Sequence, residues 1–377
     1  MANQPQQKLP PFETVTMPVR KQLATQTYGA VGTETLNADD LMYNLICKTT
    51  LNLTFSQAGS ASAVTVQDPD FPYSLVGNLP VDSNVYRQIS RMDGRLANLL
   101  KQQQDRGYDD PATTVTLPGA NSSTGTVTST GSVTIYSHIP ISATDQDLNG
   151  IVDLQADGLD ITVAQDWKSL AQIAATMGGT GNTLTAVTGT AEWTAEMLRA
   201  TTVETSNLAT YMSQAHRTSY QQQDIGGKQT VVYKFLKGPN IRRVGFMLVN
   251  GSTGFRDVGN DLGLSLITLN YGNSDVPLVL PPDLFDTLNT SPSRRVGIPY
   301  FKRYASSGTY PADVSPLGSG IYWYDGTVGL YGRDWIKTGL YTSDSINFTF
   351  ELSSSAPSNS KLFILLDRYT SPRAAAI

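Results

Sequence analysis

The sequence predicts an all-β protein made of two β-sandwiches in tandem, and three observations support this. Thr, Val and Tyr are plentiful, and these residues fit the half-buried surface of a sheet. The 32 Gly and 20 Pro supply turns for many short strands. Each half of the 377-residue chain contains about eight strand-like segments, which is the strand count of a jelly roll. The predicted fold is therefore two eight-stranded jelly rolls in tandem with a few short flanking helices.

The clearest early strand covers residues 45–55. Every second residue from Leu45 to Phe55 forms a mostly apolar face, while the residues between them, such as Lys48 and Asn52, are polar. This period of two is typical of a sheet with one solvent-facing side. A short strand at residues 64–66 follows.

Residues 83–104 are predicted to form the longest helix, because apolar residues recur there at steps of three and four. Asp82 or Ser83 would be its N-cap. The favoured interpretation is a helix laid against the end or flank of a sandwich, and the alternative is a helix that contacts a partner or a membrane surface. Basic residues would line its outer side: Arg87, Arg91, Arg95 and Lys101.

The remaining elements follow from shorter patterns. Residues 208–220 are ambiguous, either a strand or an entry segment, and residues 362–366 are continuously apolar, as in a strand buried on both faces. A weaker helix is expected at 167–177 and a short one at 283–288. The other expected strands are 133–141, 159–163, 184–193, 231–235, 244–248, 262–266, 321–324, 328–331 and 346–352.

The predicted organisation is a flexible arm at residues 1–11, a first jelly roll at 12–200 and a second at 201–377. The N-terminus lacks the apolar core of a signal peptide, and no stretch reaches the roughly 18 apolar residues of a membrane span. We therefore expect a soluble chain that is made in the host cytoplasm.

The residue inventory argues against an enzyme. Cys47 is the single cysteine and is expected to be a buried apolar residue, so an intrachain disulfide and a Cys/His zinc site are excluded. A Ser–His–Asp triad would need His138 or His216, and neither lies in a nucleophile-elbow pattern. His138 is expected on the face opposite the isoleucines of its strand. No catalytic residue, metal or cofactor is predicted.

Four weaker patterns have an ordinary explanation beside the functional one. Residues 178–181 resemble a phosphate loop but lack its lysine, so a flexible turn is expected. The aspartates could bind calcium but lack the EF-hand spacing and its terminal Glu, and the paired glutamates are only weak glycosidase candidates. The aromatic run could form a sugar platform, but the favoured interpretation is a strand with alternating buried rings. These residues are Asp145, Asp147, Asp153 and Asp157, then Glu192 and Glu196, then Tyr322, Trp323 and Tyr324.

The net charge of −5 and the absence of a long basic block argue against sequence-specific nucleic-acid binding. Basic residues nonetheless lie near both ends of the chain. If both ends leave the same side of the molecule, they could face anionic lipid headgroups or nucleic acid, and scattered surface charges or interface ion pairs are the equal alternative. The candidate contacts on that side, called the inner face below, are Arg20, Lys21, Arg368 and Arg373, and further basic pairs lie at Arg242–Arg243 and Arg294–Arg295.

Several short motifs occur in a fixed order along the chain. Tyr136 precedes Ile139-Pro140-Ile141 and then Asp147-Leu148-Asn149-Gly150, and Arg294-Arg295-Val296-Gly297 precedes the run from Gly320 to Asp325. Together with Thr25-Gln26-Thr27-Tyr28, this series resembles the double jelly-roll major capsid proteins of tectivirus-type, membrane-containing icosahedral phages. The resemblance extends along nearly the whole chain, although the loop at 119–131 has no counterpart and the N-terminal arm is shorter.

The resemblance implies a structural role in a virion. Three subunits would form a homotrimeric capsomer of pseudo-hexagonal outline, and such trimers would tile an icosahedral shell over an internal lipid membrane. The implied partners are other copies of the chain, penton and minor capsid or cement proteins, and inner membrane lipids or membrane proteins. Two alternatives remain: a virion spike or receptor-binding protein, and a carbohydrate-binding or glycoside-hydrolase β-sandwich.

Overall fold

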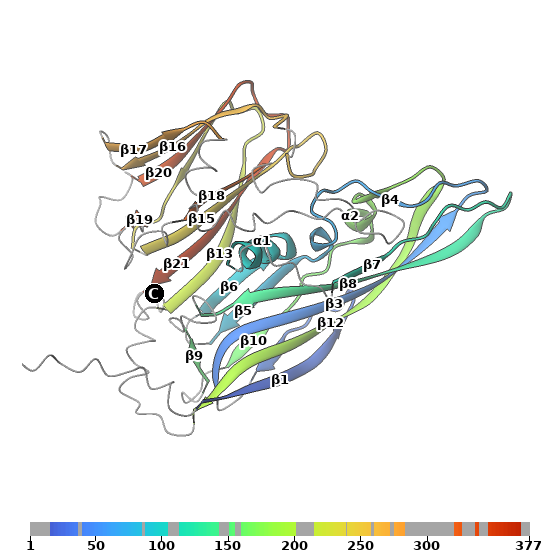
Figure 1. Cartoon of the computed structure of the whole chain (residues 1–377), viewed down its shortest axis with the longest axis horizontal. Helices are drawn as coiled ribbons and strands as arrows, with labels where there is room; N and C mark the ends of the chain where they lie inside the picture. Colours follow the sequence, from blue (N-terminus) through green and yellow to red (C-terminus); the bar gives the residue numbers. More distant parts are fainter. Residues whose placement is uncertain are drawn as a thin grey trace, which may run out of the picture.

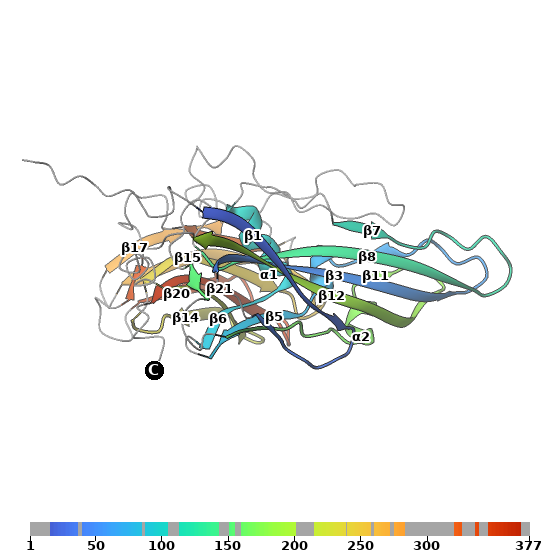
Figure 2. The same cartoon turned by 90° about the horizontal axis from the view of Figure 1, so that it is seen from below.

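Two β-sandwiches lie side by side, and one sheet of each is joined to the other in a continuous sheet (Figure 1). The structure is a computed structural model, and Figure 2 shows it from below. It describes residues 16–36, 40–84, 87–104, 113–142, 151–154, 160–200, 215–238, 240–257, 260–271, 275–282, 320–325, 336–338 and 346–370.

The first sandwich has a long outer sheet in the order β1-β12-β3-β8-β7, with β9 paired to β3. Leu45, Cys47, Leu51 and their neighbours of the same parity on β3 are buried, so the predicted alternation is confirmed. Its strands are β1 (Thr16–Thr27), β3 (Leu41–Gln57), β7 (Thr114–Thr116), β8 (Val127–Pro140), β9 (Val152–Asp153) and β12 (Asn182–Ala200).

The second layer is a sheet that both halves share, in the order β18-β15-β21-β13-β6-β5-β10-β2, with β19 paired to β15. The halves meet where β13 runs parallel to β6, and the hydroxyls of Ser90 and Thr218 lie 2.6 Å apart there. The strands are β2 (Glu34–Leu36), β5 (Asn78–Ser83), β6 (Arg87–Asp93), β10 (Ile161–Val163), β13 (Ala215–Asp224), β15 (Asn240–Val249), β18 (Ile321–Asp325), β19 (Ile336–Lys337) and β21 (Lys361–Thr370).

A four-stranded outer sheet in the order β14-β20-β16-β17 completes the second sandwich, and a small pair, β11-β4, lies in the first. Short helices fill the connections. The strands are β4 (Thr65–Val66), β11 (Met177–Gly178), β14 (Thr230–Lys234), β16 (Leu264–Tyr271), β17 (Asp275–Leu280) and β20 (Ile346–Leu352), and the helices are η2 (Tyr73–Leu75), α1 (Gly94–Gln104) and α2 (Leu170–Ala174).

Strand β21 is buried on both faces, as its continuous apolar run predicts. Leu362, Ile364 and Leu366 face the core of the second sandwich, while Phe363 and Leu365 face the core of the first. The neighbouring strand β15 divides its side chains in the same way. The two halves therefore share buried apolar surface as well as a sheet.

The single helix predicted at residues 83–104 is wrong in its first half. Residues Arg87–Asp93 form β6, which hydrogen-bonds to β5 and to β13. Helix α1 begins at Gly94, where a Cβ would lie 2.5 Å from the Cβ of Val76. Asp93, rather than Asp82 or Ser83, caps it, because its carboxylate accepts the N–H of Leu96 at 2.9 Å. Of the described basic residues, Arg91 is exposed and Arg95 is largely buried.

Other boundaries differ by smaller amounts. Helix α2 is shorter than predicted and begins at Leu170, after the N-cap residue Ser169, which forms a capping box with Gln172. Strand β12 extends beyond the predicted 184–193. A register shift between Leu264 and Leu266 turns Ile267 inward, so the predicted alternation through Leu266 is wrong there.

Some predictions fall outside the described residues. These are the arm at 1–11, the helix at 283–288, the strand at 328–331, Asp145, Asp147, Asp157, the Arg294–Arg295 pair and Arg373, together with the side chains of Asp153 and His216. No helix in the described part of the chain is both long and apolar enough to cross a membrane.

Candidate functional site

The outer face of the β1-β12-β3-β8 sheet holds the two glutamates considered as glycosidase candidates. Glu196 accepts hydrogen bonds from Arg20 at 3.1 Å and from Asn44 at 2.8 Å, and Glu192 pairs with Lys48 at 3.1 Å. Each carboxylate therefore has its own cation on a neighbouring strand. This arrangement stabilises a sheet face and provides no free acid–base pair.

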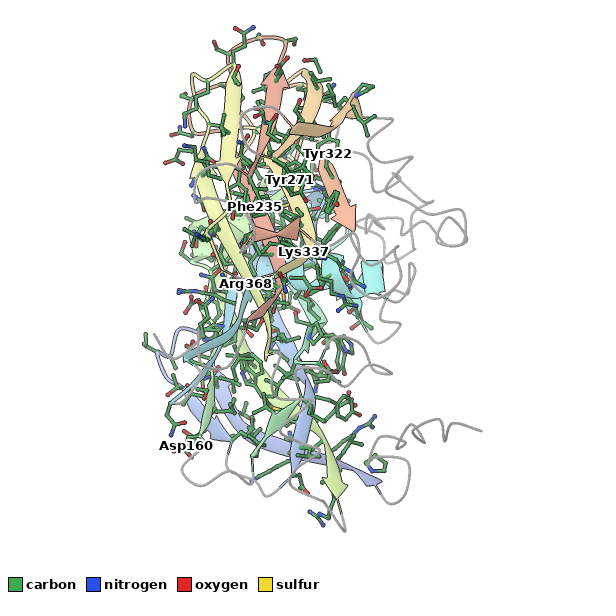
Figure 3. The ribbon with its side chains drawn as sticks, turned by 90° about the vertical axis from the view of Figure 1, so that its left-hand side faces the viewer. Asp160, Phe235, Tyr271, Tyr322, Lys337 and Arg368 are labelled. Carbon is green, nitrogen blue, oxygen red and sulfur yellow. The ribbon has the colours of Figure 1, made fainter. Side chains whose placement is uncertain are left out.

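The candidate inner-face basic residues lie on two different sheets. Arg20 and Lys21 are exposed on β1, an edge strand that also carries Pro18. Strand β1 also has a register shift between Gln22 and Thr25. Such an irregularity, together with exposed charges, is typical of an edge strand that is protected from pairing with strands of other molecules. Arg368 lies on β21 (Figure 3), where burial lowers the pKa of its guanidinium and Tyr233 opposes that shift.

Cys47, which was expected to be a buried apolar residue, lies on β3, and His138, one of the two histidines considered for a triad, lies on β8. Cys47 is fully buried, and burial raises the pKa of its thiol to about 12, so it stays protonated and unreactive at neutral pH. Its thiol donates to Gln165 at 3.4 Å. His138 lies half-buried on the face opposite Ile139, as predicted.

The aromatic run on β18 is buried rather than exposed as a sugar platform. Tyr322 belongs to the core of the second sandwich, whereas Trp323 packs on the core of the first. Phe235, Tyr271 and Tyr322 come from separate segments and gather in the second sandwich (Figure 3). The favoured prediction of a strand with buried rings is confirmed.

A buried charged cluster joins the halves, and sequence analysis missed it. Asp70 and Arg256 form an ion pair of 2.7 Å whose side chains are 2% and 1% exposed. Arg95 pairs with Asp93 at 2.8 Å and lies 5.1 Å from the ring centroid of Phe363 in the second half. The partners are up to 186 residues apart in sequence, so no local pattern could indicate them.

Asp68 provides a test of this cluster. Burial and the charge of Asp70 raise its pKa, so the folded state binds a proton more readily than the unfolded state. Replacing Asp68 with Asn is expected to increase the free energy of unfolding at pH 7, because Asn keeps the acceptor for the Asp70 N–H and removes the charge. The gain should shrink as the pH falls through the raised pKa and disappear near the ordinary value of about 3.9. Urea titrations of the wild-type chain and of Asp68→Asn at pH 7 and pH 4 measure this gain. A lower free energy of unfolding for Asp68→Asn at pH 7 would contradict the raised pKa of Asp68.

The long strands of the first sandwich end in a projecting tip, formed by residues 57–62, 119–127 and 179–183 (Figures 1 and 2). It contains no charged residue. The side chain of Gln57 donates to the carbonyl of Gly119 and to Asn182, both at 2.9 Å, and Asn182 donates to the carbonyl of Ser62. The predicted turn at 178–181 is part of this tip. Side-chain amides thus connect all three segments.

Asn121 is the second anchor of the tip, because its amide donates to the carbonyls of Ala58 at 2.8 Å and Gly125 at 2.9 Å. Replacing Asn121 with Ala is expected to cost about 1–3 kcal/mol locally, since it leaves these acceptors without their donor. Hydrogen exchange should accelerate at two backbone N–H groups of the tip. That of Ser60 donates to the carbonyl of Ser123, and that of Ser123 donates to the side chain of Asn121. Replacing the exposed Gln22 on β1 of the same sheet with Ala is the control, and equal exchange in both variants would refute the anchoring role.

Among the described residues, no group of three or more His, Cys, Asp or Glu side chains is placed to hold a metal ion. No family model matches the chain, and no curated protein matches it in sequence. Its structure matches the crystal structure of the MCP, or major capsid protein, of STIV, Sulfolobus turreted icosahedral virus, with a TM-score of 0.60 and 12% identity. That match covers 94% of this chain and 97% of the other. The fold is a double jelly roll.

Two further structures share this double jelly roll. PBCV-1 VP54, whose crystal structure was fitted into a reconstruction of the virophage Sputnik, matches with a TM-score of 0.53 and 9% identity, over 94% of each chain. The Faustovirus major capsid protein matches with a TM-score of 0.50 and 8% identity, over 94% of this chain and 90% of the other. At such identities the likeness extends to the fold, and the tectivirus phages suggested by the sequence motifs are not among these three proteins.

Proposed function

We propose that this chain is the major capsid protein of an icosahedral virus, a structural subunit rather than an enzyme. The observation that carries the proposal is the end-to-end match of both sandwiches to the STIV major capsid protein. A binding module with one sandwich would match only half of such a protein. The neutralised glutamates and the buried aromatic run on β18 weaken the carbohydrate alternative.

The proposed mechanism is self-assembly. Three copies form a capsomer with a pseudo-hexagonal outline, because each copy contributes two similar jelly rolls around a three-fold axis. We keep the proposed boundary between residues 200 and 201, with one jelly roll on each side. Capsomers then tile a shell, with penton and minor capsid or cement proteins as further partners.

Size-exclusion chromatography with light scattering, followed by negative-stain imaging, tests this proposal. We expect a mass about three times the 40.7-kDa chain and particles with a hexagonal outline. A stable monomer without that outline would remove the capsid assignment. A trimer with an elongated, fibrous outline would favour a spike protein instead.

The proposed shell encloses a lipid membrane, with Arg20, Lys21, Arg368 and Arg373 on its inner side. Flotation of the purified protein with vesicles containing anionic phosphatidylglycerol tests this part separately. Binding should fall on replacing Arg20 and Lys21 with Gln and at high salt, as for surface charges near anionic headgroups. Equal flotation with neutral vesicles would contradict the inner-face role without affecting the capsomer.

A further inference from the structure

One large surface of the first jelly roll is almost free of charge. The register of the outer sheet aligns five threonines in one row across five strands, and all of them are partly or fully exposed. The two following rows, which pass through Asn52 and Thr54 of β3, contain only Thr, Ser, Asn and Ala. We call these three rows the threonine face, and its first row is Thr27, Thr190, Thr50, Thr134 and Thr114.

Charged residues on the same side of the sheet lie beside this face and are already paired. Lys48 with Glu192 and Arg20 with Glu196 are held at 3.1 and 3.0 Å within one copy. A surface that meets only water normally carries many charged side chains of both signs. The cores of protein interfaces are instead depleted of charge and surrounded by a polar rim. The sheet shows this combination, with the threonine face as the core and the two ion pairs as the rim.

The dimensions of the sheet fit a stable interface. The outward side of β3 runs from Asn44 to Ser56, about 40 Å at the usual rise per residue, and the neighbouring strands make the sheet about 20 Å wide. The resulting area of about 800 Å², which includes the threonine face and the rows on either side of it, equals the share that each partner contributes to a standard interface. Threonine is also stiff at χ1, so little side-chain entropy is lost when it is covered.

We propose that the threonine face is a contact between copies of this chain. The inference rests on the proposed self-assembly and names the surface that performs it. A chain with net charge −5 repels its own copies. A contact between copies therefore costs least free energy where the surface that becomes buried contains no unpaired charge. In a closed three-fold ring the face of one copy meets a different surface of the next.

Two variants at Thr50 test this contact, with Thr35 on β2 as the matched control, because Thr35 is exposed on the other sheet. Thr50→Glu is expected to abolish the trimer in light scattering, while Thr35→Glu remains trimeric. In the assembled protein, Thr50→Cys should react with a maleimide at least about ten times more slowly than Thr35→Cys, as expected for a thiol covered at an interface. The native Cys47 is buried and adds little background.

The outcomes separate the two proposals. A trimer in which Thr50→Cys reacts as fast as Thr35→Cys would overturn the threonine face and leave the capsomer standing. A monomeric wild-type chain would overturn both. If Thr50→Glu loses the β-sheet circular dichroism spectrum, the thiol protection of Thr50→Cys decides alone.

Discussion

Replacing Arg256 with Met is expected to lower the free energy of unfolding by about 3–5 kcal/mol. The Asp70 carboxylate lies 2.7 Å from Arg256 and is 2% exposed, so removal of the guanidinium leaves a buried charge without its closest partner. The second oxygen of Asp70 has no hydrogen-bond partner among the described residues, so Arg256 provides the side-chain contact of this carboxylate. Urea denaturation followed by circular dichroism measures the loss.

The chain offers a matched control in Arg20, which pairs with Glu196 at 3.0 Å but is 76% exposed. Replacing Arg20 with Met should change stability by no more than about 1 kcal/mol, because water solvates the remaining carboxylate. Changing Asp70 to Leu together with Arg256 to Met should recover most of the loss, since neither position then buries a charge. Equal losses for Arg20 and Arg256 would show that burial does not set the strength of these pairs.

The position of this ion pair also explains why it matters to the whole molecule. Asp70 belongs to the first half of the chain and Arg256 to the second, so the pair connects two jelly rolls that each have a separate apolar core. The pair therefore helps to fix the position of one roll relative to the other. A buried pair provides this with geometric specificity that apolar contact alone lacks.

Local periodicity predicted most of the strands, because a strand with one solvated face alternates at every residue. Strand β3 illustrates this, whereas the buried strand β21 was predicted from its continuous apolar run. It failed at residues 87–93, where the apolar residues Ile89 and Met92 lie three positions apart, a step that fits one face of a helix. These residues form a strand because β5 and β13 both hydrogen-bond to it, and β13 lies more than 120 residues away in sequence.

The candidate surfaces were harder to predict than the elements. The threonine face depends on register, which aligns residues from β1, β12, β3, β8 and β7 that no local window contains together. The charged cluster likewise joins loops and strands from both halves. Single residues such as Glu192 and Glu196 seemed notable in sequence only because their partners, Lys48 and Arg20, lie on other strands.

Replacing Phe348 with Ala is expected to cost about 3–5 kcal/mol, as for other aromatic residues removed from a packed core. Phe348 is fully buried, and its ring centroid lies 4.8 Å from that of Phe246 and 5.8 Å from that of Phe235. Replacing the exposed Glu351 of the same strand with Ala should change stability by about 0.5 kcal/mol at most. Thermal or urea unfolding measures both, and a loss below about 1 kcal/mol for Phe348 would contradict the packed core.

The same variant also tests whether the two jelly rolls unfold as one unit. Although Phe348 lies in the second core, β15 and β21 place Met247, Val249, Phe363 and Leu365 against the first core, so loss of the second roll exposes apolar surface of the first. We therefore expect a single transition in which circular dichroism and tryptophan fluorescence coincide. Two separated transitions would mean that the shared sheet does not couple the halves, and that the chain consists of two independently stable jelly rolls.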